Sequence, residues 1–248
     1  MSTRLNPPGL SLDLPPHVAQ SVFDDGQCMA SALADSVAAM LRLGLWQRGD
    51  ASLLVSGGRS PLPFLRALSQ RKLDWSRVSV SLVDERWVPA EHADSNARLV
   101  RENLLQGAAS VAHFVPLYGG EDSPEAGLDA CEGRLRRLQR PFDAVVLGMG
   151  DDGHFASLFP GVADLATLLA DGAPTLAATR PASAAHARIT LSLAALQDAR
   201  NLLLQITGER KRAVLETAAR DGDRLALPVA ALLHQTRTPL RVFFSPIE

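Results

Sequence analysis

The stretch VVLGMGDDGHFASLFPG, residues 145–161, decides which fold the sequence predicts. It begins with an apolar run and then changes to two glycines, Gly148 and Gly150, two acids and one histidine, His154. An apolar run that ends in a glycine turn with polar residues indicates a buried strand that delivers side chains to a site. His154 is the natural centre of that site, because imidazole groups titrate at about 6.5 in model peptides and suit proton transfer near neutrality.

Short apolar segments alternate with loops and amphipathic helices along the rest of the chain. Strands are expected at 52–55, 78–83, 113–116, 142–147, 188–193, 201–206 and 240–244, and helices at about 26–47, 61–70, 96–105, 208–219 and 228–233, with one more beginning at 123–124. This order predicts an α/β fold: a single-domain, doubly wound, mostly parallel sheet with helices on both faces, similar to a Rossmann fold. We expect an extended, proline-containing lead-in over residues 1–20 and one α/β domain over residues 21–248.

The composition argues against several kinds of partner. The chain has 248 residues, 46% of them hydrophobic and 21% charged, with a net charge of -2 and no long run of one sign. This is typical of a globular protein and indicates neither a nucleic-acid footprint nor a membrane-surface patch. We find no signal-peptide core and no run of about 20 apolar residues, and therefore expect a cytoplasmic protein. Cys28 and Cys131 lack metal spacing and are expected to be small buried residues.

Four loops that each follow an expected strand carry the unusual polar residues. They are residues 56–60, 84–89, 148–154 and 207–211. If the strands are parallel neighbours, the four loops lie along one edge of the sheet, where such sheets bind ligands. Together they supply a glycine loop for an anion, arginine and lysine, and a histidine beside acids. That combination suits a small phosphorylated substrate and a proton-transfer step.

Each of these signals has a simpler reading. The glycine loop could be only a tight turn, and residues 84–89 only a solvated turn with a surface ion pair. No second histidine or cysteine stands at ligand spacing around His154, so we expect no metal, and the GxSxG motif of serine hydrolases is absent. The other histidines give weak signals: His92 is expected to be solvated, and His186 to lie in a loop of small residues near Arg188.

Six motifs occur in an order that resembles the 6-phosphogluconolactonases, members of the glucosamine-6-phosphate isomerase/6-phosphogluconolactonase family. They are SGGRSP (56–61), DERWVP (84–89), SN (95–96), GMGDDGHFASLFPG (148–161), RITL (188–191) and TGERK (207–211). The resemblance implies hydrolysis of 6-phosphoglucono-δ-lactone to 6-phosphogluconate in the oxidative pentose phosphate pathway, without a metal or organic cofactor. It also implies the fold of hexosamine-phosphate deaminases and ribose-5-phosphate isomerase. The chain departs from the family pattern at Arg59 and Ser60, where Ser-Thr is usual, and at Asp151, where proline is usual.

The resemblance also implies roles for individual residues. His154 would be the general base on water, Asp152 would orient the imidazole or help to hold the loop, and Arg86 or backbone N–H groups would stabilise the oxyanion. Substrate and phosphate binding would fall to Ser56, Gly57, Gly58, Arg59, Ser60, Asp84, Asn96, Gly150, Arg188 and Lys211. Which cations meet the phosphate, and whether Asp151 or Asp152 is the acid beside His154, stay open. The expected partner is a phosphorylated sugar lactone, and the protein is expected to be a monomer or a weak homo-oligomer.

Two alternatives remain. A sugar-phosphate deaminase or isomerase on the same fold would share the glycine loop and Asp-Gly-His, but those enzymes typically have Asp-Glu-Tyr at 84–86 and Ile-Ala-Phe-Asn-Glu-Pro at 155–160. Here these segments read Asp-Glu-Arg and Phe-Ala-Ser-Leu-Phe-Pro. A non-catalytic sugar-phosphate sensor is the second alternative, although a pure binder has no need of a base at His154.

Overall fold

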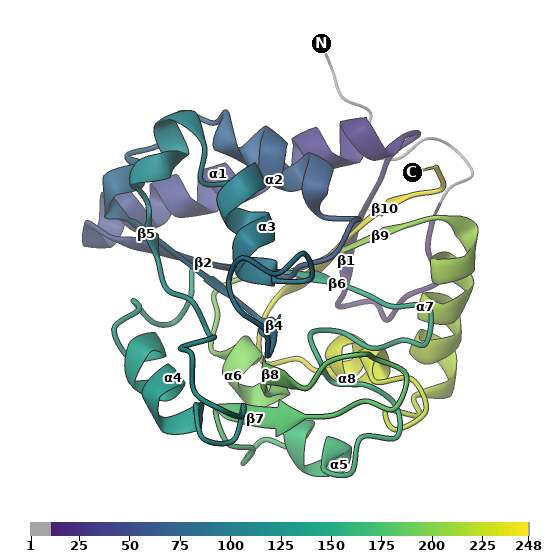
Figure 1. Ribbon diagram of the computed structural model, residues 1–248. Helices are drawn as coiled ribbons and strands as arrows, with labels where there is room; N and C mark the ends of the chain where they lie inside the picture. Colours follow the sequence, from purple (N-terminus) through teal and green to yellow (C-terminus); the bar gives the residue numbers. More distant parts are fainter. Residues whose placement is uncertain (1–10, 248) are drawn as a thin grey trace.

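A parallel sheet of seven strands forms the centre of the molecule (Figure 1). The computed structural model describes residues 11–247, so the first half of the expected lead-in lies outside the described residues. The strand order is β1 (Ala19–Val22), β10 (Leu240–Ser245), β9 (Leu202–Thr207), β6 (Ala144–Gly148), β2 (Ala51–Val55), β3 (Val78–Leu82) and β5 (His113–Phe114). The central strands are nearly continuous apolar runs, as strands buried on both faces require.

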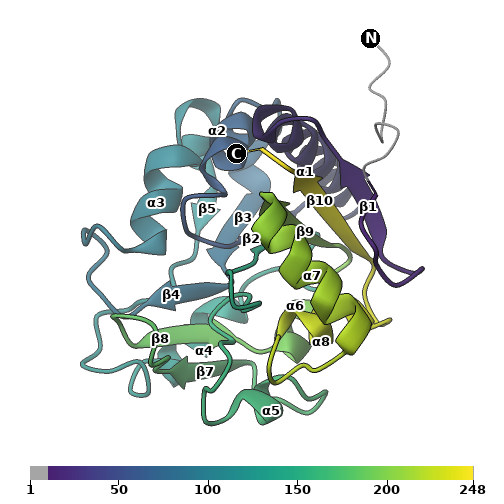
Figure 2. The ribbon, with the colours of Figure 1, turned by 90° about the vertical axis from the view of Figure 1, so that its right-hand side faces the viewer.

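Helices cover both faces of this sheet, which confirms the predicted doubly wound α/β fold (Figures 1 and 2). One face carries α1 (Gly26–Arg48), α2 (Leu62–Ser69) and α3 (Asn96–Asn103), and the other α4 (Leu128–Leu135), α6 (Leu193–Gln197), α7 (Glu209–Asp221) and α8 (Val229–His234). The chain runs along the sheet from β1 to β5 and then returns through β6 and β9 to β10. Because crossovers are right-handed, the outward and return connections place their helices on opposite faces.

The long helix α1 shows how local signals and packing agree. Asp25 caps its N-terminus by accepting the N–H of Cys28 at 2.7 Å, and Gly49 ends it in the left-handed conformation with φ of 89°. By length and composition alone α1 passes the test for a helix that could cross a membrane, which is weak evidence for a single helix. The core helix of a globular protein passes the same test, and the apolar stripe of α1, including Leu33 and Val37, is buried within the structure.

A second, three-stranded antiparallel sheet lies next to the carboxyl end of β3. It consists of β4 (Asp84–Arg86), β8 (Arg188–Leu191) and β7 (Leu176–Thr179) in the order β4-β8-β7 (Figure 2). Val83 connects the two sheets, because its N–H donates to Val55 in the large sheet and its carbonyl accepts the N–H of Leu191 in the small one. Residues 84–86, expected as part of a loop, are therefore a strand, and 188–191 belong to this second sheet.

Several local expectations were wrong or imprecise. The helix expected from residue 123 begins at Leu128, after a turn over 124–127, and the strand expected at 113–116 is limited to two residues. Cys28 is exposed, because it lies on the first turn of α1 away from the buried stripe, whereas Cys131 is buried as expected. The boundary placed at residue 20 falls inside β1, whose residues 19–22 pair with β10.

Candidate active site

The loops that follow β2, β3, β6 and β9 meet in one cavity, as the sequence predicted. These four strands are consecutive in the sheet, in the order β9-β6-β2-β3, so their carboxyl ends share one edge. The cavity has a volume of about 260 Å³. Its wall contains all the predicted site residues except Asp152: Ser56, Gly57, Gly58, Arg59, Ser60, Asp84, Arg86, Asn96, Gly150, His154, Arg188 and Lys211. Pro61, Gly148, Met149 and Ala156 complete the lining.

His154 is held by a carboxylate on one ring nitrogen. Asp152 Oδ1 lies 2.5 Å from His154 Nδ1 and also accepts the backbone N–H of His154 at 3.2 Å. With Nδ1 in this contact, Nε2 is the ring nitrogen free to exchange a proton. Burial raises the pKa of Asp152, but hydrogen bonds and the charge interaction with His154 outweigh it, so its pKa lies below the ordinary value. The pair therefore consists of a carboxylate and an imidazole that it orients.

The question of which acid accompanies His154 is answered by the backbone of the loop. Asp151 points elsewhere and lies 3.4 Å from Arg210 in an exposed ion pair, whereas Asp152 meets the imidazole. Gly150 makes this turn possible, because a Cβ there would lie 2.2 Å from the His154 ring. Its N–H donates to the carbonyl of His154 at 2.9 Å and closes the turn.

An aromatic ring supports the imidazole from one face. The Phe159 ring is stacked on His154 with centroids 3.7 Å apart and an interplanar angle of 18°. The guanidinium of Arg188 lies over the same Phe159 ring, 5.2 Å from its centroid. Phe159 thus positions His154, a role that the sequence analysis missed. Its place within the motif 148–161, five residues after the histidine, could have pointed to it.

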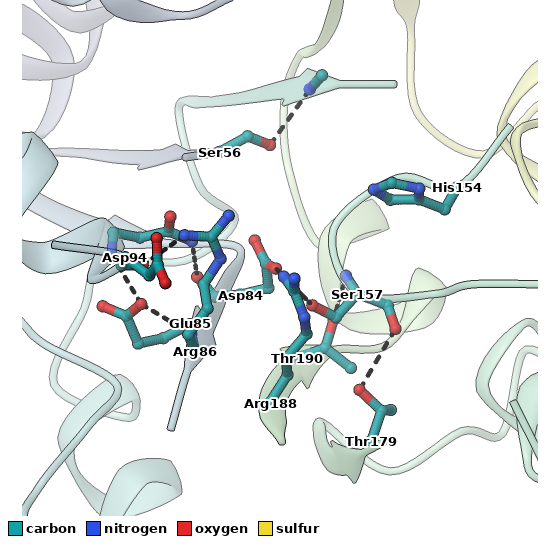
Figure 3. Close-up of polar contacts among 12 residues, drawn as sticks. Ser56, Asp84, Glu85, Arg86, Asp94, His154, Ser157, Thr179, Arg188 and Thr190 are labelled. Atoms are coloured by element: carbon teal, nitrogen blue, oxygen red, sulfur yellow. Dashed lines mark hydrogen bonds and ion pairs between the residues drawn. The ribbon is translucent and has the colours of Figure 1, made fainter. Parts of the chain in front are cut away.

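A buried polar cluster fastens the histidine loop to the small sheet (Figure 3). Ser157 donates its hydroxyl to Asp84 Oδ2 at 2.5 Å, and its N–H donates to Thr190 Oγ1 at 3.1 Å. Arg188 Nη1 lies 3.6 Å from the same Asp84 oxygen. Asp84 and Ser157 therefore fix both the loop and the arginine. Neighbouring Ala156 has a φ of 48°, a conformation rare outside glycine, which places backbone strain at the cavity wall.

Arg188 is a cation held in a desolvated position beside the cavity. Burial lowers its pKa, and the charge of Asp84 counteracts that effect. Its Nε is buried and has no hydrogen-bond partner among the described residues. A guanidinium with an unfilled donor next to a cavity is suited to an anionic ligand, for which it can supply two parallel hydrogen bonds.

Glu85 fixes the part of the cavity wall that contains Arg86 and Asn96, although the sequence alone gave it no role. It is fully buried and its two oxygens accept the N–H groups of Arg86, Asn96 and Ala97 at 2.7–2.8 Å and the hydroxyl of Ser95 at 3.2 Å. Burial raises its pKa, and these hydrogen bonds act against that effect. A carboxylate at the first turn of α3 satisfies N–H groups that the helix leaves free. Glu85 therefore fixes the residues that follow it on this wall.

Asn96 is presented to the cavity by this arrangement. Its Nδ2 donates to the carbonyl of Asp84 at 3.0 Å, and its Oδ1 is buried without a partner among the described residues. A Cβ at Gly57 would lie 1.8 Å from that oxygen, so only glycine fits there. The glycine loop is thus more than a strand-to-helix turn, because it makes room for a polar side chain from another element.

The remaining predicted residues line the cavity in different ways. Ser56 is a structural tie, since its hydroxyl accepts the N–H of Gly148 at 3.2 Å. Arg86 donates from Nη1 to the carbonyl of Asp94, and its Nε is buried without a partner in the described part of the chain. Lys211, on the first turn of α7, lines the cavity and also a neighbouring hollow of about 690 Å³. The exposed Arg59 lines both as well.

The fold and this cavity define an α/β protein with a cation-lined cavity and an oriented histidine at the edge of its parallel sheet. A profile for "Glucosamine-6-phosphate isomerases/6-phosphogluconolactonase" matches residues 24–240, and the chain belongs to that family. A protein of Rhizobium meliloti named 6-phosphogluconolactonase is 45% identical over 226 residues, which cover 91% of this chain and 97% of that protein.

Solved structures agree with this assignment. The crystal structure of a 6-phosphogluconolactonase from Shewanella baltica superposes with a TM-score of 0.90 at 42% identity, covering 95% of this chain and all of that one. A monomeric glucosamine-6-phosphate deaminase of the NagB superfamily superposes with a TM-score of 0.74 at 17% identity, over 92% of this chain and 97% of that one. At that identity the second likeness shows the shared fold alone, which is the fold expected from the sequence.

Proposed function

We propose that the protein hydrolyses 6-phosphoglucono-δ-lactone to 6-phosphogluconate. The single observation that carries the proposal is the His154–Asp152 pair in a cavity whose wall also holds three arginines and a lysine at the edge of the sheet. An oriented base supplies the proton transfer that lactone opening needs, and the cations suit a phosphorylated substrate. Relatives with this name at 45% identity over nearly the whole chain support the choice of lactone.

The proposed reaction begins with a water molecule bound near His154. Nε2 of the imidazole accepts a proton from this water while the oxygen attacks the lactone carbonyl carbon. The resulting imidazolium is stabilised by the Asp152 carboxylate, which lies 2.5 Å from Nδ1. The ring oxygen leaves as the C–O bond breaks and takes the proton back from His154, which regenerates the base. The new carboxyl group then releases its own proton to solvent.

The charge that develops on the carbonyl oxygen needs donors fixed in advance. We assign this role to Arg86, whose Nε is buried and lacks a partner among the described residues, together with backbone N–H groups that line the cavity. Lys211, Arg188 and the loop 57–60 would hold the phosphate. Asp84 would act by holding Arg188, and Asn96 by hydrogen bonding to the sugar through its free Oδ1.

A coupled assay tests the reaction directly. Glucose-6-phosphate dehydrogenase supplies the lactone, and a pH-stat records acid release above the spontaneous rate. We expect acceleration of lactone opening and no ammonia release from glucosamine 6-phosphate, because Phe155–Pro160 lacks the glutamate that the deaminase motif carries. Ammonia release without lactonase activity would favour the deaminase alternative. Calorimetric binding of 6-phosphogluconate without any acceleration would favour the sensor.

We further propose that the chain from β1 (Ala19–Val22) onward acts as one catalytic domain, in the cytoplasm, without a catalytic metal or organic cofactor. The proposed partner is the phosphorylated sugar lactone alone, with no nucleic acid or membrane, and the proposed state is a monomer or weak homo-oligomer. The net charge of -2 without runs of one sign supports the absence of a nucleic-acid partner. Undiminished lactonase activity in excess chelator, and sedimentation as a monomer or a concentration-dependent dimer, are the expected results.

A further inference from the structure

Three side chains able to bind metals gather at the rim of the cavity, outside the residues assigned to the reaction. His92, Asp94 and His186 place one ligand atom each within 4.8 Å of one another. Asp94 Oδ2 lies 2.9 Å from His186 Nε2 and 3.9 Å from His92 Nδ1. We propose that these three residues, the rim triad, bind a divalent transition metal ion such as Zn²⁺. The proposal does not depend on the proposed lactonase reaction.

The spacing of the rim triad is close to what a metal ion requires. Zinc binds nitrogen and carboxylate oxygen at about 2.0–2.2 Å, so two ligands on a tetrahedral ion are roughly 3.3 Å apart. The observed separations of 2.9 and 3.9 Å lie on either side of that value. The two imidazole rings are 5.3 Å apart and nearly perpendicular, at 81°, so they are not stacked on each other. All three ligand atoms lie within 4.8 Å of one another, so rotation of the side chains would bring them around one ion.

The ligand atoms are available for binding. The recorded polar contact of the His186 side chain is Asp94 itself, a second ligand of the proposed ion. The N–H of Asp94 donates to His92 Nδ1 at 3.1 Å, which favours the tautomer with its lone pair on that nitrogen. A bound ion would replace this hydrogen bond and the contact between His186 Nε2 and Asp94 Oδ2.

The ligand chemistry selects a class of ion. Two imidazole nitrogens and one carboxylate oxygen suit Zn²⁺, Co²⁺, Ni²⁺ or Cu²⁺, whereas Mg²⁺ and Ca²⁺ prefer all-oxygen sites. The side chains of His92 and Asp94 are 43% and 56% exposed, so water can complete the coordination. Such an open three-ligand site binds more weakly than a closed four-ligand structural zinc site.

The position of the rim triad gives the ion a structural consequence. Asp94 stands two residues before Asn96, and His186 stands two residues before Arg188, both of which line the cavity. Arg86 also donates to the carbonyl of Asp94. A bound ion would therefore join two segments 92 residues apart in the sequence, at the point where each enters the cavity wall.

The experiment uses untagged full-length protein, freed of metal by chelation and titrated with ZnCl₂ in a calorimeter, with Co²⁺ absorption as a second probe. His186→Ala and His92→Ala remove one ligand each, and His113→Ala, which removes an exposed histidine from β5, is the matched control. We expect one ion per chain, with affinity lowered by at least about 10–100-fold in the two ligand variants, the range known for outer-shell partners alone. His113→Ala and His154→Ala are expected to bind like the wild type.

Three results would overturn the proposal. They are no saturable Zn²⁺ binding by the wild type, wild-type affinity in both His186→Ala and His92→Ala, or a loss of binding confined to His154→Ala, which would place the ion in the reaction site. Displacement of Zn²⁺ by equimolar Mg²⁺ would also contradict the nitrogen ligand set. Circular dichroism of each variant verifies that it is folded, and His92 is exposed enough that its removal leaves the core intact.

Discussion

Replacing Asp152 separates its charge from its role in holding His154. In Asp152→Asn the amide oxygen can take the place of Oδ1 and still accept both the ring Nδ1–H and the backbone N–H of His154. What is lost is the negative charge that stabilises the imidazolium formed during the reaction. In Asp152→Ala both hydrogen bonds are lost as well, so the ring can turn on its stack with Phe159.

The two substitutions are expected to lower kcat by different amounts. A hydrogen bond to a charged group contributes about 1.5–3 kcal/mol and a neutral one about 0.5–1.5 kcal/mol. The difference is about 1–1.5 kcal/mol, which corresponds to a roughly 5–15-fold lower kcat for Asp152→Asn. The side chain is 42% exposed, which places the effect toward the lower end. Loss of orientation in Asp152→Ala is expected to lower kcat by about 100-fold.

Initial rates of lactone hydrolysis from pH 5 to 8 provide the measurement. The ratio of the wild-type kcat to the Asp152→Asn kcat is expected to stay constant over this range, because the contact with His154 holds the pKa of Asp152 below its ordinary value and the wild-type carboxylate remains charged throughout. Asp151→Asn is the matched control: its acid pairs with Arg210 rather than with the histidine, so its profile is expected to follow the wild type. Equal effects of Asp151→Asn and Asp152→Asn, or wild-type rates in Asp152→Ala, would refute the assignment of Asp152 as the orienting acid.

Three further substitutions test the cavity wall. Glu85→Gln turns an amide N–H₂ toward the N–H groups at the start of α3 and is expected to lower the free energy of unfolding by about 1–3 kcal/mol in urea melts; an unchanged midpoint would contradict the buried acceptor role. Gly57→Ala places a Cβ 1.8 Å from Asn96 Oδ1, so the substituted protein is expected to fold but to have a higher KM. Wild-type kinetics would show that the loop moves enough to accept the Cβ. Lys211→Ala is expected to raise KM roughly 10–100-fold with little change in kcat, since a charge-assisted hydrogen bond is worth about 1.5–3 kcal/mol; an unchanged KM removes it from the phosphate site.

The large sheet and the meeting of its loops could be predicted because their signals are local. Apolar runs such as 144–147 and 202–206 are read directly, and a parallel sheet brings their carboxyl ends to one edge. The small sheet was missed as a unit because β4 is a charged triplet, Asp84–Arg86. It is stabilised by side chains about 70 to 100 residues away, including Ser157 and Arg188.

Two features of the site needed three-dimensional information. Asp151 and Asp152 are equivalent in sequence, and only the turn at Gly150 decides which one meets the imidazole. Glu85 stands between two other charged residues, so the sequence around it gives no sign that it is buried. Its role depends on contacts with the start of α3, where Ser95 is ten residues further along the chain. The rim triad escaped for the same reason, since His186 lies far in sequence from His92 and Asp94.

Turnover by His154→Ala is the most direct test of the proposed general base. The variant is expected to fold, because the imidazole is at the cavity wall and 26% exposed, and to bind 6-phosphogluconate with little change. Its kcat for 6-phosphoglucono-δ-lactone should be lower by about 10²–10⁴-fold, the range for losing a general base. A folded His154→Ala protein that opens the lactone at a rate near wild type would contradict the mechanism.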